Sequence, residues 1–212
     1  MEPNLTEHLR EQNEYKIIVI GAVAVGKTSL VMRYVHDQFR ERMSTLIAEK
    51  DKVVTVDGQE VHLKIWDTAG QERYQSITNR FYAETKAVIV VYDIVNEDTW
   101  TDVDYWAKEL NYYLLNELDA GMPVLFVGNK KDLVDRRDED QKIVSFRQVQ
   151  EVANAYGFLS PVEVSAKTGH NVEKAFTAIV RQLLKINEGK DSSHTRPKDN
   201  FKPPGSTCCS VS

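Results

Sequence analysis

The residues with the clearest chemistry are GAVAVGKT at positions 21–28, which match the pattern GxxxxGK followed by Ser or Thr. An apolar run, 15–20, comes before them, and apolar residues at helical spacing follow in 29–36. In a loop between a strand and a helix, backbone N–H groups converge on phosphate oxygens, and the positive end of the helix favours negative charge. Lys27 can reach the β- and γ-phosphates, and the Thr28 hydroxyl can bind Mg²⁺.

This pattern predicts a polyphosphate-binding loop. The alternative is a plain glycine turn, which would not require Lys and Thr directly after the second glycine. The predicted phosphate-contacting residues of the loop are Val23, Ala24, Val25, Gly26, Lys27, Thr28 and Ser29.

A second motif, DTAGQ at 67–71, follows the apolar run 63–66. The Asp67 carboxylate can hold a water molecule on Mg²⁺, and Gly70 can bring a backbone N–H to the γ-phosphate. The alternative is an ordinary turn at the end of a strand.

Two further motifs predict which base is bound. NKKD at 129–132 follows the run 124–127, and SAK at 165–167 follows the last predicted strand. The Asp132 carboxylate accepts two hydrogen bonds, which matches N1–H and N2–H₂ of guanine and not the edge of adenine, so GTP is favoured over ATP. Ala166 can offer its N–H to guanine O6. Alone, NKKD could be a solvated loop and SAK a helix N-cap; their order, each after a predicted strand, favours binding.

Composition predicts one α/β domain with polar ends, because the chain has 212 residues, of which 42% are hydrophobic and 28% charged. The net charge of −5 argues against nucleic acid as a partner. No apolar stretch is long enough to span a bilayer, and residues 1–14 lack the apolar core of a secretory signal, which predicts a cytosolic chain. A monomer is the default expectation. Cys208 and Cys209 are adjacent near the C-terminus, so they cannot link parts of the core.

The periodicity predicts a mostly parallel sheet covered by helices. Strands are expected at 15–20, 51–56, 61–66, 87–92, 123–128 and 161–164, and helices near 27–37, 74–83, 98–117, 145–156 and 171–187. Asp57 and Gly58 join two of the strands in a hairpin, which predicts one antiparallel edge strand. Ligands are expected beyond the carboxyl ends of the parallel strands. The predicted organisation is a polar extension at 1–14, a domain at 15–187 and a disordered tail at 188–212.

Together, GAVAVGKT, WDTAGQERY, NKKD, SAK and the double cysteine resemble the Rab family of small GTPases, over 15–187 and the tail. AVGK, VVYDIVNE and the CC ending are most similar to the endosomal subgroup. The resemblance implies a P-loop G domain with a six-stranded sheet and five helices. It also implies a membrane-anchored switch in vesicle or endosomal trafficking that binds GTP or GDP with Mg²⁺ and hydrolyses GTP.

The resemblance implies a role for each motif residue. Thr28 and Thr45 would bind the metal directly, and Asp67 through water. Gln71 would orient the attacking water; an amide is a poor proton acceptor, so it is not a general base. Contacts of Thr45 and Gly70 with the γ-phosphate end would hold two loops that are released after hydrolysis. The residues assigned to the guanine are Asn129, Lys130, Asp132, Ser165, Ala166 and Lys167. Phe39 would cover the guanine or ribose face, or serve as a buried anchor beside Val35.

Two departures from the family pattern bear on function. Val23 stands where relatives carry a small residue, which predicts slow hydrolysis unless neighbouring changes accommodate it. The first switch, residues 39–45, is one residue shorter than the family pattern. After it, Ile47 and Lys50 stand where relatives carry a glycine and an aromatic residue, which predicts unfamiliar effectors. The alternative function is therefore a slowly hydrolysing, GTP-loaded docking module. An ATP-using P-loop kinase is disfavoured by NKKD.

The ending CCSVS resembles the double-cysteine signal for geranylgeranylation of Cys208 and Cys209. Its last four residues also fit a CaaX box with one farnesyl on Cys209. Two chains are favoured because one lipid binds membranes only marginally and the charges of the tail nearly balance. The implied partners are an exchange factor, a GTPase-activating protein, effectors, and the prenylation and membrane-extraction machinery. The implied location is the cytoplasmic face of an endosomal or vesicular membrane, with a soluble cytosolic pool.

Overall fold

The computed structural model describes residues 14–40, 48–68, 84–116, 121–136 and 143–188. The elements in chain order are β1 (Glu14–Ile20), α2 (Lys27–His36), β2 (Ala48–Val56), β3 (Gln59–Asp67), β4 (Thr85–Asp93), α4 (Thr99–Asn116), β5 (Val124–Asn129), the 3₁₀ helix η1 (Lys131–Arg136), α5 (Phe146–Tyr156), β6 (Leu159–Glu163) and α6 (Val172–Asn187). The largest difference from the predicted ranges is three residues, at β2, predicted from 51 and observed from 48. The predicted helix at 74–83 lies outside the described residues.

The six strands form one sheet in the order β2-β3-β1-β4-β5-β6. Only the β2–β3 pair is antiparallel among these neighbours. Its hairpin turns at Asp57 and Gly58, whose φ angles of 52° and 82° are the left-handed values that a tight two-residue hairpin requires. The predicted α/β fold with one antiparallel edge strand is therefore confirmed.

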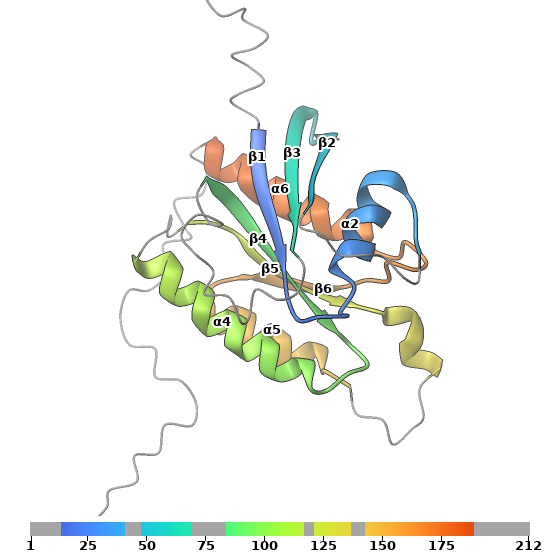
Figure 1. Cartoon of the computed structure of the whole chain (residues 1–212). Coiled ribbons are helices and arrows are strands. Elements are labelled where there is room, and N and C mark those ends of the chain that lie inside the picture. Colours follow the sequence, from blue (N-terminus) through green and yellow to red (C-terminus); the bar gives the residue numbers. More distant parts are fainter. Residues whose placement is uncertain (1–13, 41–47, 69–83, 117–120, 137–142, 189–212) are drawn as a thin grey trace, which may run out of the picture.

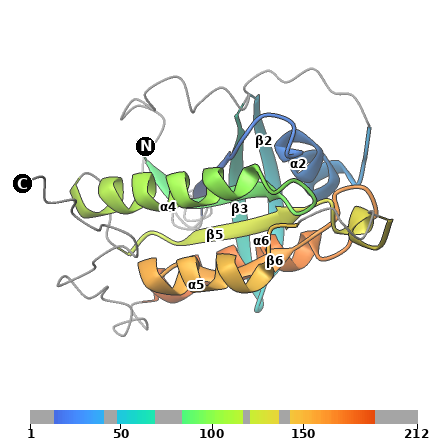
Figure 2. The same ribbon diagram turned by 90° about the horizontal axis from the view of Figure 1, so that it is seen from below.

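Helices cover both faces of the sheet, α2 and α6 on one and α4 and α5 on the other (Figures 1 and 2). Strands β4 and β5 are buried along nearly their whole length, as expected for parallel strands between two helical layers. On the α4 and α5 face, Trp106 and Phe126 are almost fully buried. The middle of the sheet is therefore a rigid core on which loops can be held.

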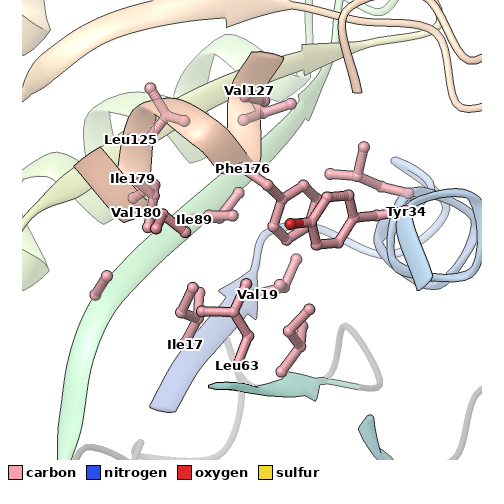
Figure 3. Close-up of a cluster of buried hydrophobic side chains, with 14 of the residues drawn as sticks. Ile17, Val19, Tyr34, Leu63, Ile89, Leu125, Val127, Phe176, Ile179 and Val180 are labelled. Atoms are coloured by element: carbon pink, nitrogen blue, oxygen red, sulfur yellow. The ribbon is translucent and has the colours of Figure 1, made fainter. Parts of the chain in front are cut away.

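On the other face, the ring of Tyr34 stacks on that of Phe176, with centroids 3.7 Å apart and planes 2° apart (Figure 3). Lys52 of β2 lies over the Tyr34 ring, 3.7 Å from its centroid. Burial raises the pKa of Tyr34, so its hydroxyl stays protonated. These contacts fix α2 against α6 and the hairpin.

The parallel strands β1, β3, β4, β5 and β6 end at the same edge of the sheet. GAVAVGKT, NKKD and SAK lie at the ends of β1, β5 and β6, and Asp67 and Thr68 of DTAGQ lie at the end of β3. The topology therefore gathers motifs that are far apart in the sequence, as the rule for open α/β sheets predicts.

Candidate functional site

The loop between β1 and α2 requires glycine at two positions, Gly21 and Gly26. Gly21 has φ 138°, and a Cβ there would lie 2.1 Å from the carbonyl oxygen of Val91. Gly26 has φ 95°, and its Cβ would lie 2.4 Å from Nδ2 of Asn129. Ala24 also has a positive φ, 65°. The loop is thus packed against β4 and against the NKKD segment.

The N-terminus of α2 faces this loop without a side-chain cap or an acidic residue in its first turn. The positive end of the helix therefore favours an anion here. Lys27 in that turn is only 5% exposed, and its Nζ donates to the carbonyl oxygens of Gly21 at 2.7 Å and Ala22 at 2.9 Å. A cation buried inside the loop adds positive charge where the sequence predicts phosphates. Val23, by contrast, is 62% exposed.

The predicted metal ligands that are described lie beside this loop. Asp67 is 3% exposed at the end of β3 and pairs in register with Val19, two residues before Gly21. The next residue, Thr68, donates its hydroxyl to the Val19 carbonyl at 2.9 Å. Thr28 is half-buried in the first turn of α2.

A carboxylate and a hydroxyl are the hard oxygen donors that Mg²⁺ prefers, and this ion commonly takes few protein ligands besides substrate phosphates. The donor set therefore fits Mg²⁺. Thr45, Gly70 and Gln71 lie outside the described residues, so their roles stay predictions.

A pocket of about 240 Å³ opens beside the loop, at the ends of β5 and β6. It is lined by Ala24, Gly26, Ser29, Phe39, Asn129, Lys130, Asp132, Leu133, Ala166 and Lys167. Three predicted segments, 23–29, 129–132 and 165–167, therefore contribute to one cavity. Phe39 lines it and packs, partly buried, against the buried cluster, and its contact with the guanine or ribose stays a prediction.

Asn129 joins the three segments. Its side chain donates from Nδ2 to the Val25 carbonyl at 2.9 Å and accepts at Oδ1 from the Ala166 N–H at 3.0 Å. The side chain is almost fully buried. The Ala166 N–H, predicted to contact guanine O6, thus also takes part in the internal organisation of the pocket; its contact with the base stays a prediction.

The Asp132 carboxylate is held by a hydrogen bond from Ser165 in the SAK segment. The Ser165 hydroxyl donates to its Oδ1 at 2.6 Å, and Ser165 Oγ in turn accepts from the Thr168 N–H at 3.1 Å. Each carboxylate oxygen has capacity for further hydrogen bonds, so Asp132 keeps acceptors for a base. The carboxylate is thereby oriented at the wall of the pocket.

Lys130 is placed by a residue that the sequence analysis did not select. Its backbone has φ 69°, and its Nζ lies 2.7 Å from Oδ2 of Asp93, at the end of β4. The Asp93 side chain is only 10% exposed. Its position at the carboxyl end of a parallel strand was the signal that could have found it. Leu133, which also lines the pocket, follows directly after NKKD.

Comparison with known proteins decides the family, because the Ras family model matches residues 16–185. The chain belongs to the Ras family. Ras-related protein RabG2 of Dictyostelium discoideum is 37% identical over 183 residues, which cover 85% of this chain and 88% of the relative. Ras-related protein Rab-1D of the same organism is 36% identical over 171 residues, covering 80% of this chain and 79% of the relative. The predicted resemblance to Rab small GTPases is confirmed.

Ras-family members are GTP hydrolases that bind guanine nucleotides and Mg²⁺. In this Ras-family protein, the described parts of the predicted site lie together at one edge of the sheet. Within the described residues, no helix has the length and apolar character that crossing a membrane requires. Cys208 and Cys209 lie outside those residues.

Proposed function

We propose that this small GTPase binds Mg²⁺·GTP at the pocket and the adjoining loop, hydrolyses it, and acts as a Rab-type switch in vesicle or endosomal trafficking. The observation that carries the proposal is the arrangement of Asn129. One buried amide ties the phosphate loop, through Val25, to the guanine segment, through Ala166. A nucleotide would bridge the same two segments, with its phosphates near Lys27 and its base near Asp132.

The chemistry of phosphoryl transfer asks the protein mainly for positioning and for stabilisation of charge. Lys27 would hold the β- and γ-phosphates, and Thr28 and Asp67 would hold the metal, Asp67 through water. Bound Mg²⁺ would neutralise negative charge on the phosphate oxygens. Gln71 would orient the attacking water, while Thr45 and Gly70 would couple the γ-phosphate to the two switch loops.

The tail would place this switch on a membrane. Prenyl groups on both Cys208 and Cys209 would give stable anchoring at the cytoplasmic face of an endosomal or vesicular membrane, because two chains bind far more strongly than one. Exchange and activating proteins, effectors, and prenylation and extraction factors would act on this anchored form and its cytosolic pool. Replacing both cysteines by serine should release the protein from membranes in a fractionation assay; continued pelleting of this variant contradicts the anchor.

Val23 supports slow hydrolysis and with it the second candidate function, a GTP-loaded docking module. Its side chain is 62% exposed, so the described neighbours do not enclose it. A β-branched group on the open side of the phosphate loop would crowd Gln71 or an arginine supplied by an activating protein. That arginine contributes about 10³–10⁵-fold in such enzymes, so the assisted rate is the one most affected.

Single-turnover hydrolysis of Mg²⁺·GTP tests both functions. We expect the wild type to hydrolyse GTP at or below about 10⁻⁴ s⁻¹, Val23→Gly to be faster, and Gln71→Leu to be nearly inactive. Val53→Gly, at an exposed valine on β2, is the matched control and should keep the wild-type rate. Equal rates for wild type and Val23→Gly would reject slow hydrolysis by the loop and favour an ordinary switch. If neither the wild type nor any variant hydrolyses GTP, the proposal that this protein is a GTP hydrolase is rejected.

A further inference from the structure

Arg33, in the last turn of α2, connects the guanine segment to the end of this helix. Its Nε donates to the Ala166 carbonyl at 2.8 Å, and its Nη2 donates to the Lys167 carbonyl at 2.8 Å. The two acceptors are neighbours in SAK, more than 130 residues away in sequence. In Figure 1 the end of α2 and the loop before α6 lie side by side.

The third arm of the same guanidinium fixes the end of α2. Nη1 donates to the Asp37 carbonyl at 3.0 Å and to its carboxylate at 2.8 Å. Asp37 is the left-handed C-cap of the helix, with φ 52°, and its own N–H donates to the Arg33 carbonyl. Two residues later the chain reaches Phe39, which lines the pocket. Arg33 thus holds two walls of one cavity.

The carbonyls that Arg33 holds belong to the segment that places the base-reading groups. The Ala166 N–H binds Asn129, and the hydroxyl of Ser165 binds Asp132. A shift of residues 165–167 would therefore strain the hydrogen bonds that hold the Asp132 carboxylate and the Asn129 amide. Arg33 contacts neither side chain itself, so it would act through the backbone between them.

Only arginine has the donors for this arrangement. Its planar guanidinium presents a rigid fork of N–H groups, whereas lysine presents a single ammonium and glutamine a single amide. The Arg33 side chain is 17% exposed, which limits competition from water. Gly169, with φ 83°, lies against it: a Cβ there would be 3.7 Å from Arg33 Cδ.

We propose that Arg33 is a positioning residue for guanine recognition, which sets both the lifetime of the bound nucleotide and the discrimination at the 2-amino group. This inference rests on the proposed function, because it assumes that guanine occupies the pocket. The 2-amino group is informative since Asp132 is the residue that would read it, and Ser165 holds Asp132.

The test measures the rates at which full-length protein releases fluorescent GDP and fluorescent inosine diphosphate (IDP). IDP lacks the 2-amino group of the base. The variants are Arg33→Gln, Arg33→Lys and Asp37→Ala. Arg181→Gln is the matched control, because Arg181 is a hydrogen-bonded arginine that pairs with Asp57 away from the pocket. Thermal melting with saturating GDP checks that each variant folds.

For Arg33→Gln we expect about tenfold faster GDP release, the change produced by losing one charged hydrogen bond of ordinary strength. The ratio of IDP to GDP release rates should fall by about threefold, because a displaced Asp132 gains less from the 2-amino group. Arg33→Lys should be intermediate. Asp37→Ala keeps the hydrogen bond from Arg33 to the Asp37 carbonyl and loses only an exposed ion pair, so it and Arg181→Gln should stay within about twofold of wild type.

Release rates of both Arg33 variants within twofold of wild type would overturn the proposal. An increase of the GDP and IDP release rates by the same factor would also overturn it, because a purely structural weakening leaves the ratio of the two rates unchanged. If Arg33→Gln does not fold, the same two criteria apply to Arg33→Lys. A wild type that releases GDP as fast as ADP overturns the proposed function and this inference together; a selective wild type with unchanged variants overturns this inference alone.

Discussion

The two halves of the candidate site are held in place by different means. Around the base pocket, side chains from separate segments connect the loops: Asn129 to Val25 and Ala166, Ser165 to Asp132, and Lys130 to Asp93. In the phosphate loop the shape comes from the backbone, with positive φ angles and close packing at its glycines. Lys27 there binds carbonyls of its own loop.

This difference predicts different responses to substitution. A backbone-shaped loop is destabilised when a Cβ is added at Gly21, because the neighbours there are main-chain atoms of β4 that cannot move independently. In a network of side chains, a single hydrogen bond can be removed without displacing the strands. Substitutions in the phosphate half should therefore lower the stability of the protein, and substitutions in the base half should change its nucleotide specificity.

The largest expected effect comes from Gly21→Ala in the phosphate loop. The new Cβ would lie 2.1 Å from the Val91 carbonyl oxygen on the rigid strand β4, so we expect a loss of about 4 kcal/mol in unfolding free energy. Gly58→Ala is the matched control: its φ is also positive, at 82°, but a Cβ there meets nothing within 4 Å. It should cost only about 1–2 kcal/mol. Urea unfolding measures both, and similar losses would refute the contrast.

A smaller effect, confined to specificity, is expected for Asp132→Asn in the base pocket. The amide donates where the carboxylate accepted, so the guanine 2-amino group meets a donor while the C2 carbonyl of xanthine meets a partner. We expect GDP affinity to fall about 100-fold, which is about 2.7 kcal/mol, and xanthosine diphosphate to bind better than in the wild type. Competition binding measures this change, and thermal stability should stay near the wild-type value. An unchanged GDP affinity would show that Asp132 does not contact the base.

The smallest effect is expected at an ion pair outside both halves. Arg181 donates to Asp57 at 3.0 Å, and both side chains are more than half exposed. Hydrogen bonding by Arg181 is the main cause that lowers the pKa of Asp57. A carboxyl group whose pKa is lower in the folded state than in the unfolded state stabilises the folded protein at pH values above its unfolded-state pKa. This stabilisation is lost as the pH falls through the folded-state pKa.

Arg181→Gln should therefore return the pKa of Asp57 toward its ordinary value, with little change in stability or nucleotide release. An NMR titration of the Asp57 carboxyl checks the direction. A pKa that stays low in this variant would show that Arg181 is not the cause.

Much of this molecule follows from local sequence. GAVAVGKT between an apolar run and a helical pattern marked the phosphate loop, and Asp57-Gly58 marked the edge hairpin, because glycine conformation and hydrophobic period act over a few residues. The strand-end rule also placed NKKD and SAK at one edge of the sheet. Family membership followed from the same motifs.

The tertiary structure alone decided which atoms hold those motifs. Arg33 and Asp93 belong to no binding motif in the sequence, yet they bind residues 133 and 37 positions away, at Ala166 and Lys130. Phe39 lines the pocket and also packs against the core, a dual role that the sequence could not select. The physical reason is range: turn chemistry and periodicity depend on neighbours along the chain, whereas a hydrogen bond between distant loops depends on how the whole sheet packs.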